Sequence, residues 1–207
     1  MIELYTWGTS NGRKASVMLE EVGLAYCVKP VDLSRKEQHS PEYLRIHPDA
    51  KIPAIVDHDP PSGFFKPFRV FESGAILLYL AEKSGRLLPA DPAERSVCLQ
   101  WLMLGMTSVG PIFAQNHWFR RHAIEKVPDA IQRYSELTEH LYEVLDARLA
   151  EVPHLAGEAY TIADIATLPW VARHEWQEVQ LDRYPAVKDW YERLMKRPAV
   201  IRGFAVP

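Results

Sequence analysis

Cysteine is scarce in this chain: its 207 residues include only Cys27 and Cys98. The two thiols form no CxxC pair and stand at no metal-ligand spacing, and His174-Glu175 lacks the second histidine of an HExxH site. These absences argue against a structural disulfide, a metal site and a dithiol of the chain's own. We expect both thiols to be buried and free, in a protein of the reducing cytoplasm.

An excess of charge of one sign is also missing. The net charge of −3 and the sequence pI near 6.2 give no electrostatic case for binding nucleic acid or an acidic membrane. The N-terminus has no basic region followed by an apolar run, and no stretch reads as long enough to span a bilayer. Small molecules and other proteins are therefore the expected partners.

What is present is ordinary for a globular protein, with 47% hydrophobic and 25% charged residues. Up to residue 84, strand and helix patterns alternate in the order βαβαββα. The strand patterns are 2–6, 26–31, 54–56 and 69–71, and the helix patterns are 13–22, 41–47 and 73–84. This order predicts an α/β, thioredoxin-like domain over residues 1–84, in which a parallel βαβ unit joins an antiparallel pair.

Residues 85–92 read as a linker, because they contain glycine and two prolines and the composition changes on either side. Residues 93–207 then predict an all-α helical-bundle domain, with a kink where Gly110-Pro111 interrupts a long helix. Within it, Thr161 and Asp164 have the spacing of a capping box, so we assign them a structural role at a helix start.

Two short segments in the first domain favour a ligand site. In Lys51-Ile-Pro-Ala, Pro53 heads an apolar run, so it lies at an edge or forms a cis bond that holds a tight turn and exposes the backbone of Ile52. In Phe71-Glu-Ser, Ser73 reads as the N-cap of a helix, whose amide end suits a carboxylate. Glu72 adds a negative charge beside this helix end. A ligand with a carboxylate and an ammonium group on one carbon, as at an amino-acid terminus, would suit the helix end and Glu72 together.

The loop Trp7–Gly12 occupies the place where a thioredoxin-like oxidoreductase carries its CxxC, yet it has no sulfur. It offers the hydroxyl and amide groups of Thr9, Ser10 and Asn11 at a helix N-terminus, which would stabilise a thiolate supplied by a ligand. The alternative is structural: Ser10 or Asn11 caps the helix and does nothing else.

These residues resemble the glutathione site of the glutathione transferase superfamily. The resemblance extends over nearly the whole chain and is carried by Leu4-Tyr5-Thr6, the Lys51-Ile-Pro turn, Glu72-Ser73, Gln115-Asn116-His117 and Tyr160–Asp164. It is strongest for the bacterial nu-class branch of glutathione-dependent disulfide-bond reductases, which also resembles the yeast prion-forming nitrogen regulator. One departure is His47-Pro-Asp-Ala50, where relatives often have Asn or Gly before the lysine.

The resemblance implies a role for each matched residue. Thr9 and Asn11 match thiol-facing residues, and Ser10 is a rival because serine-using classes align a catalytic serine near it. The implied glutathione-binding residues are Gln38, Lys51, Ile52, Pro53, Glu72, Ser73 and Arg133, and the implied cosubstrate pocket contains Asn116, His117 and Phe119. His117 is the obvious general-acid candidate, although a histidine among aromatic residues is more often structural.

The implied activity is reduction of disulfides by glutathione, with exchange between ligand sulfurs while Thr9 and Asn11 position them. Two alternatives remain open: conjugation of glutathione to small electrophiles, and a non-catalytic, glutathione-binding regulatory role. The resemblance also implies a homodimer, glutathione or its disulfide as the cosubstrate, and no metal.

Overall fold

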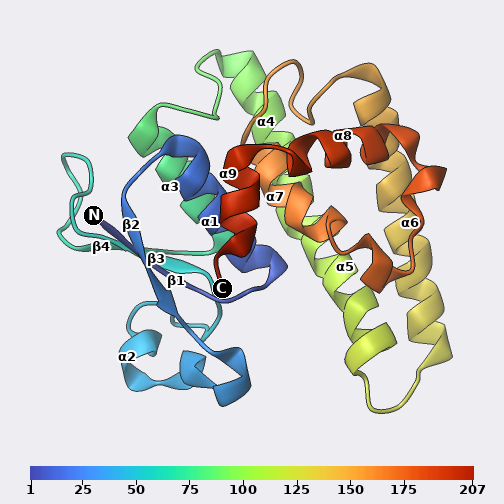
Figure 1. Ribbon diagram of the computed structural model, residues 1–207, viewed down its shortest axis with the longest axis horizontal. Coiled ribbons are helices and arrows are strands. Elements are labelled where there is room, and N and C mark those ends of the chain that lie inside the picture. The colour runs from blue at the N-terminus through green and yellow to red at the C-terminus, as the bar shows by residue number, and fades with distance from the viewer. The chain divides into compact units, whose positions relative to one another are not determined.

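The computed structural model describes all 207 residues, which form two compact units (Figure 1). The first contains Met1–Leu88 together with Lys196–Pro207, and the second contains Pro89–Met195. The C-terminal residues thus group with the first unit rather than with the helical segment to which the sequence pattern assigns them.

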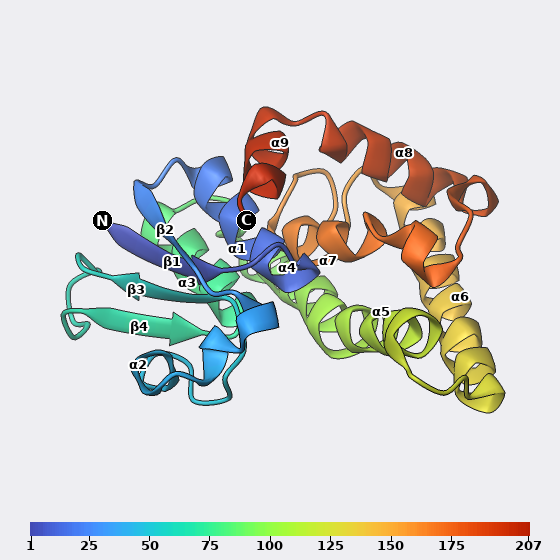
Figure 2. The same cartoon turned by 60° about the horizontal axis from the view of Figure 1, so that its bottom comes forward.

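The first unit has the predicted thioredoxin-like order. Its elements are β1 (Ile2–Thr6), α1 (Ser10–Val22), β2 (Tyr26–Pro30), α2 (Pro41–Leu44), β3 (Ala54–Asp57), β4 (Phe68–Phe71), α3 (Ser73–Ser84) and α9 (Pro198–Ala205). The strands form one sheet in the order β2-β1-β3-β4, in which β1 pairs with β2 in parallel and the other pairs are antiparallel. In Figure 2, β3 and β4 run side by side and α2 lies below them. The predicted fold class is confirmed for this unit.

Helix α1 begins three residues before its predicted start, because the N-cap is Thr9. The Thr9 backbone is extended, and its hydroxyl accepts a hydrogen bond of 3.0 Å from the Gly12 N–H. The prediction that Ser10 or Asn11 is the N-cap was therefore wrong, since both residues lie in the first turn of the helix. At the other end, Gly23 is the C-cap in the left-handed region, with φ of 72°.

Helix α9 packs against α1, and the two helices are neighbours in both ribbon views. Gly203 makes the contact possible, since a Cβ there would lie 2.6 Å from Val17 Cα. The Ser16 hydroxyl donates to the Gly203 carbonyl at 2.7 Å, and Arg197 forms two hydrogen bonds to Glu21, at 2.7 and 2.9 Å. These contacts explain why the last residues belong to the first unit.

One buried carboxylate links the sheet to α3 through hydrogen bonds. Asp57, at the end of β3, is fully buried and accepts from Tyr79 Oη at 2.7 Å, Lys83 Nζ at 2.5 Å and the Asp59 N–H at 2.9 Å. Burial acts to raise the pKa of Asp57, but the hydrogen bonds from Lys83, Tyr79 and Asp59 outweigh it and hold the pKa below its usual value.

The second unit is all-helical, as predicted. Its elements are α4 (Pro92–Leu104), α5 (Gly110–His117), α6 (Pro128–Glu151), α7 (Ile162–Val171) and α8 (Pro185–Met195), with π-helical segments at Gly105–Val109 and Trp118–His122. The first π segment ends immediately before Gly110-Pro111. Pro111 has no backbone N–H to donate. It is tolerated here because the regular α-helical hydrogen-bond pattern is already interrupted just before it.

Residues Pro92–His122 form one helix of 31 residues, and an 18-residue window in it has a mean hydropathy of 1.5. By length and composition this helix could cross a membrane, so the expectation that no stretch reaches that length was wrong. A core helix of a globular domain passes the same test, and 33% of the window is buried within the structure.

The capping box at the start of α7 anchors the helical unit. The Thr161 hydroxyl accepts from the Ala163 N–H at 3.3 Å, and Asp164 accepts from the Thr161 N–H at 2.9 Å. The same carboxylate, which is completely buried, also accepts from the Leu155 N–H at 3.0 Å and Trp190 Nε1 at 2.9 Å. Asp164 thus joins the helix start to a loop and to α8.

Candidate functional site

Strand register brings three segments of the first unit to one end of the sheet. Ala54 of β3 pairs with Tyr5 of β1 on one side and with Phe71 of β4 on the other. Because both pairings are antiparallel, Pro53, which precedes Ala54, lies beside the C-terminal ends of β1 and β4. The loop that leads to Thr9, the Ile52-Pro53 turn and Glu72-Ser73 therefore converge, although they are far apart in sequence.

The three candidate thiol-facing residues have different environments. Thr9 and Asn11 are half-buried, whereas Ser10 is only 3% exposed and its hydroxyl is buried with no hydrogen-bond partner. The Thr9 hydroxyl accepts from the Gly12 N–H, so its own proton is available to a second acceptor. This geometry favours Thr9 and Asn11 over Ser10 as groups that can reach a ligand.

Gly12 allows the loop to fold back on the first turn of α1. A Cβ at this position would overlap the Trp7 carbonyl oxygen and would lie 2.5 Å from the Thr6 hydroxyl. The backbone of the loop can therefore approach the helix only because residue 12 has no side chain.

The Ile52-Pro53 peptide bond is cis, one of the two conformations that the sequence indicates for a proline heading this strand. Ile52 and Pro53 are buried, and the Tyr43 hydroxyl donates to the Lys51 carbonyl at 2.5 Å, which fixes the chain entering the turn. The Lys51 side chain is exposed and pairs with Asp49 at 2.6 Å. Lys51 can thus face solvent or a ligand at the rim of the turn.

At the start of α3 the structure corrects the predicted cap by one residue. Helix α3 begins at Ser73, and the N-cap is Glu72, with φ of 68° and no side-chain capping bond. A positive φ is uncommon for glutamate and stores strain, which often occurs at ligand sites. Glu72 is exposed and Ser73 is buried at the helix N-terminus, so a carboxylate acceptor lies beside a helix end that favours anions.

Gln38 lies in the short 3₁₀ turn Glu37–His39, and its Oε1 atom is buried without a hydrogen-bond partner. Such an atom is suited to accept a bond from a ligand. Arg133 is exposed on α6 in the helical unit.

Two of the three expected pocket residues are committed to internal contacts of the helical unit. Asn116 is buried, donates to Thr138 Oγ1 at 2.8 Å and accepts from Arg120 Nε at 2.6 Å. His117 is only 6% exposed, with its ring 5.9 Å from that of Trp170. Burial, assisted by the neighbouring positive charges of the helical unit, lowers the pKa of His117 to about 4. A neutral imidazole at pH 7 is a poor general acid, so the structure supports the structural alternative.

Phe119, the third expected pocket residue, is half-buried and stacks on Tyr134 with ring centroids 5.5 Å apart. Trp118 beside it is exposed and meets it edge-on, with centroids 4.9 Å apart. Of the three expected pocket residues, Phe119 alone lies next to an exposed apolar surface.

Sequence reasoning missed two buried basic side chains, whose pKa values are lowered by burial and raised in part by the charge of Glu72. Lys14 on α1 is 1% exposed, and His47, before the cis turn, is also buried. Glu72 acts on both groups and opposes the lowering of their pKa by burial. A signal was available for Lys14, since it lies four residues before Met18 on the apolar face of α1. Burial of His47 depends on packing against Tyr43 and on the fold of the loop, which the sequence does not reveal.

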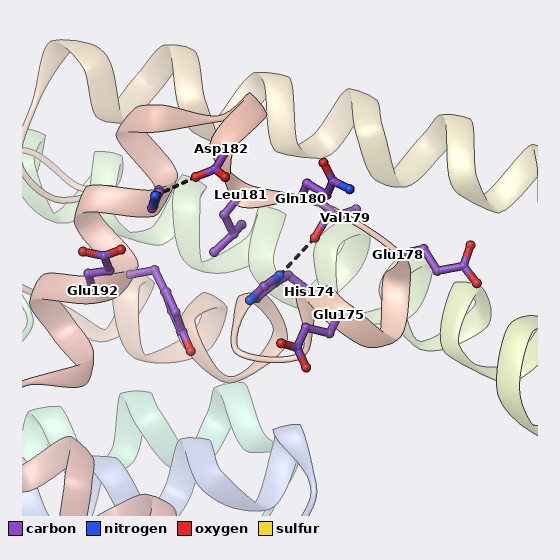
Figure 3. Close-up of a pocket in the computed structure, with 10 residues that line it drawn as sticks. His174, Glu175, Glu178, Val179, Gln180, Leu181, Asp182 and Glu192 are labelled. Atoms are coloured by element: carbon purple, nitrogen blue, oxygen red, sulfur yellow. Dashed lines mark hydrogen bonds and ion pairs between the residues drawn. The ribbon is translucent and has the colours of Figure 1, made fainter.

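A cavity of about 560 Å³ lies in the helical unit, lined by residues between His174 and Glu192 (Figure 3). Its lining is rich in carboxylates, and several of its polar groups have partners. The His174 ring bonds to the Val179 carbonyl at 3.0 Å, Asp182 accepts from Lys188 at 2.6 Å, and Glu178 accepts from Arg120. It contains none of the expected site residues. No group of three or more His, Cys, Asp or Glu residues in the chain could hold a metal.

The chain belongs to the glutathione S-transferase family: residues 1–82 match the family's N-terminal domain and residues 101–198 its C-terminal domain. It is 50% identical over 199 residues to the disulfide-bond oxidoreductase YfcG of Escherichia coli (strain K12), a match covering 96% of this chain and 92% of that protein.

Two similar crystal structures are bacterial glutathione transferases. The Pseudomonas fluorescens pf-5 family member, with two glutathione bound, has a TM-score of 0.94 and 41% identity, and covers 100% of this chain and 93% of that one. The Pseudomonas putida enzyme, with one glutathione disulfide bound per subunit, has a TM-score of 0.92 and 40% identity, and covers 100% and 91%. The predicted family and fold are confirmed.

Proposed function

We propose that this chain is an enzyme that reduces disulfides with glutathione, and that it binds glutathione or its disulfide in the first unit. The observation that carries the proposal is the convergence of the Thr9 loop, the Ile52-Pro53 turn and Glu72-Ser73 at one end of the sheet. The similarity to a disulfide-bond oxidoreductase and to transferases with two glutathione or a glutathione disulfide bound supports the same conclusion.

Each end of the tripeptide has a matching group at this site. The amide end of α3 at Ser73 suits the γ-glutamyl carboxylate, and Glu72 suits the ammonium on the same carbon. The backbone at Ile52 suits the cysteinyl backbone, while the buried Gln38 Oε1 and the exposed Lys51 ammonium offer partners for the remaining polar groups of the tripeptide. The buried, unpartnered Gln38 Oε1 is consistent with a site completed by a ligand.

The protein's part in the chemistry is to stabilise a thiolate that the substrate supplies. A free thiol has a pKa of about 8.5, and each unit of lowering needs about 1.4 kcal/mol of preferential thiolate stabilisation. The Thr9 hydroxyl, the Asn11 amide and the N-terminus of α1 can supply this through charge-assisted hydrogen bonds and the helix dipole. The thiolate attacks one sulfur of the disulfide, the other sulfur leaves as thiolate, and a second glutathione repeats the exchange.

Parallel assays separate reduction from its alternative. We expect turnover of hydroxyethyl disulfide with glutathione and little or no turnover of an aryl halide. The reverse pattern would assign conjugation, which uses the same activated thiolate as its nucleophile. Glutathione binding without either activity would assign a regulatory role.

Substitutions in the loop test which groups face the sulfur. Loss of one charge-assisted hydrogen bond, worth about 1.5–3 kcal/mol, lowers kcat/KM roughly 10- to 150-fold, and we expect this for Thr9→Ala and Asn11→Ala. Ser10→Ala should stay within about threefold, because the Ser10 side chain is almost fully buried whereas those of Thr9 and Asn11 are partly exposed. Thr9→Ser is the control, since it keeps both the cap and the hydroxyl proton. Equal activity of the three alanine variants would contradict the assignment.

The family resemblance also supports a homodimer that works in the cytoplasm, where a pool of reduced glutathione is maintained. Light scattering behind a sizing column tests the dimer, with the mass of one 23.7 kDa chain as the alternative outcome.

A further inference from the structure

The turn His47-Pro-Asp-Ala50, which leads into Lys51 and the cis bond, has no role in the proposed chemistry. The backbone of Ala50 lies in the left-handed region, with φ of 50°. Glycine and asparagine adopt this region readily, whereas alanine is strained in it. The turn therefore depends on contacts that hold Ala50 in this conformation.

His47 closes the turn with both its main chain and its side chain. Its carbonyl accepts from the Ala50 N–H at 3.1 Å, and its ring Nδ1 accepts from the Asp49 N–H at 3.3 Å. A ring nitrogen accepts only when it carries no proton, so this ring is neutral with its proton on Nε2. Burial of His47, which is 2% exposed, lowers its pKa and favours the neutral form.

The ring of His47 also contacts both of the segments that are proposed to bind glutathione. Its centroid lies 5.0 Å from that of Phe71, the residue before Glu72. It stacks on Tyr43 with centroids 6.4 Å apart, and the Tyr43 hydroxyl donates to the Lys51 carbonyl. His47 is thus connected to the strand end that precedes Glu72 and to the chain that enters the cis turn.

The exposed groups of the turn offer a weaker constraint. Asp49 pairs with Lys51 at 2.6 Å, but both side chains are exposed, and such surface pairs contribute little. Tyr43, in contrast, is buried and packs in one apolar cluster with Ile52. The buried pair of Tyr43 and His47 therefore holds the turn in place beside Ile52.

We propose that His47 is a positioning residue for glutathione binding: its ring Nδ1 holds the strained turn at Ala50, and with it the Ile52 backbone, in the conformation that receives the cysteinyl backbone. This inference rests on the proposed glutathione site. It makes a buried acceptor the essential group at position 47. Asparagine, whose Oδ1 accepts from the N–H two residues further on, should replace the histidine, whereas phenylalanine should not.

Calorimetry with S-methylglutathione, a probe without a free thiol, tests the inference. We expect His47→Phe, which keeps an aromatic ring and loses the acceptor, to raise Kd about two- to twelvefold, the factor that one hydrogen bond supplies. His47→Asn, which keeps the acceptor and loses the ring, should stay within about threefold of the wild type. In disulfide turnover, His47→Phe should raise KM for glutathione and leave kcat within about twofold, because it changes binding and not the groups that face the sulfur.

The strained backbone of Ala50 provides a second test. Ala50→Val introduces a β-branched residue that the left-handed region disfavours strongly, so Kd should rise about three- to fivefold. Ala25→Val is the matched control, because Ala25 is exposed in the same unit and has no positive φ, and it should bind like the wild type. Ala50→Asn relieves the strain, so adding His47→Phe to this variant should raise Kd by less than about twofold.

A purely structural histidine gives a different set of results. His47→Phe would then lower the melting temperature while the folded protein kept the wild-type Kd, or His47→Asn would bind as weakly as His47→Phe. Either result overturns the inference. If no His47 variant folds, Ala50→Val decides it, and wild-type binding by Ala50→Val overturns the inference as well. If the wild type itself does not bind S-methylglutathione, the proposed function fails, which is a distinguishable outcome.

Discussion

Removal of the Asp164 carboxylate should strongly destabilise the protein. Three buried N–H groups depend on it: those of Thr161 at 2.9 Å, Leu155 at 3.0 Å and the Trp190 indole at 2.9 Å. A buried donor left without an acceptor costs about 1–3 kcal/mol, and the three losses share one site, so Asp164→Ala should cost about 3–6 kcal/mol. That is a large part of the roughly 5–15 kcal/mol by which domains are stable.

Guanidinium unfolding followed by circular dichroism measures this loss. Asp164→Asn provides an intermediate case, because its one amide oxygen can serve Leu155 and Trp190 while its NH₂ group faces the Thr161 N–H. Asp182→Ala is the control, since it removes an exposed partner of Lys188 and should leave the unfolding midpoint unchanged. The reasoning is refuted if Asp164→Ala and Asp182→Ala shift the midpoint equally, or if the asparagine variant is as unstable as the alanine variant.

Three further predictions concern packing, acid stability and the thiols. Gly203→Ala should cost about 1–3 kcal/mol through overpacking against α1, measured by thermal denaturation, whereas Gly8→Ala, whose Cβ has no neighbour closer than 3.9 Å, should be neutral. The lowered pKa of Asp57 gives stability that is complete above the unfolded value of 3.8 and is lost as the pH falls through the folded value; Asp57→Asn should flatten this acid limb in melts across a pH series. Replacement of Cys27 and Cys98 by serine should leave disulfide turnover within about twofold, because the reacting sulfurs belong to the ligands, and its loss would point to a protein thiol instead.

The order of elements in the first unit could be predicted because each carries a local signal. The alternation of residues 2–6, the stop at Gly23 and the apolar stripe of Ile76, Leu77 and Leu80 depend only on near neighbours, and all three are present in the structure. The capping box at Thr161 and Asp164 was predictable for the same reason. Its links to Leu155 and Trp190 were not, because they join segments that meet only after packing.

The two caps that were assigned to the wrong residue at the candidate site have a common physical origin. A cap depends on backbone dihedral angles, and serine, threonine and asparagine all suit the position, so the sequence could not distinguish Thr9 from Ser10 or Asn11. Glu72 occupies the N-cap in a conformation that local preference disfavours and tertiary structure imposes. The burial of His117 and Asn116 likewise depends on packing between helices, which periodicity alone does not specify.

The placement of α9 has a consequence for biosynthesis. Val17 on α1 is covered by a segment that follows it by almost the whole chain, so the sheet and its helices emerge from the ribosome with one apolar face still open. The region that carries the candidate site can complete its packing only when translation reaches residues 198–205. A nascent chain stalled before that point should be sensitive to protease at α1, and release of the complete chain should remove that sensitivity.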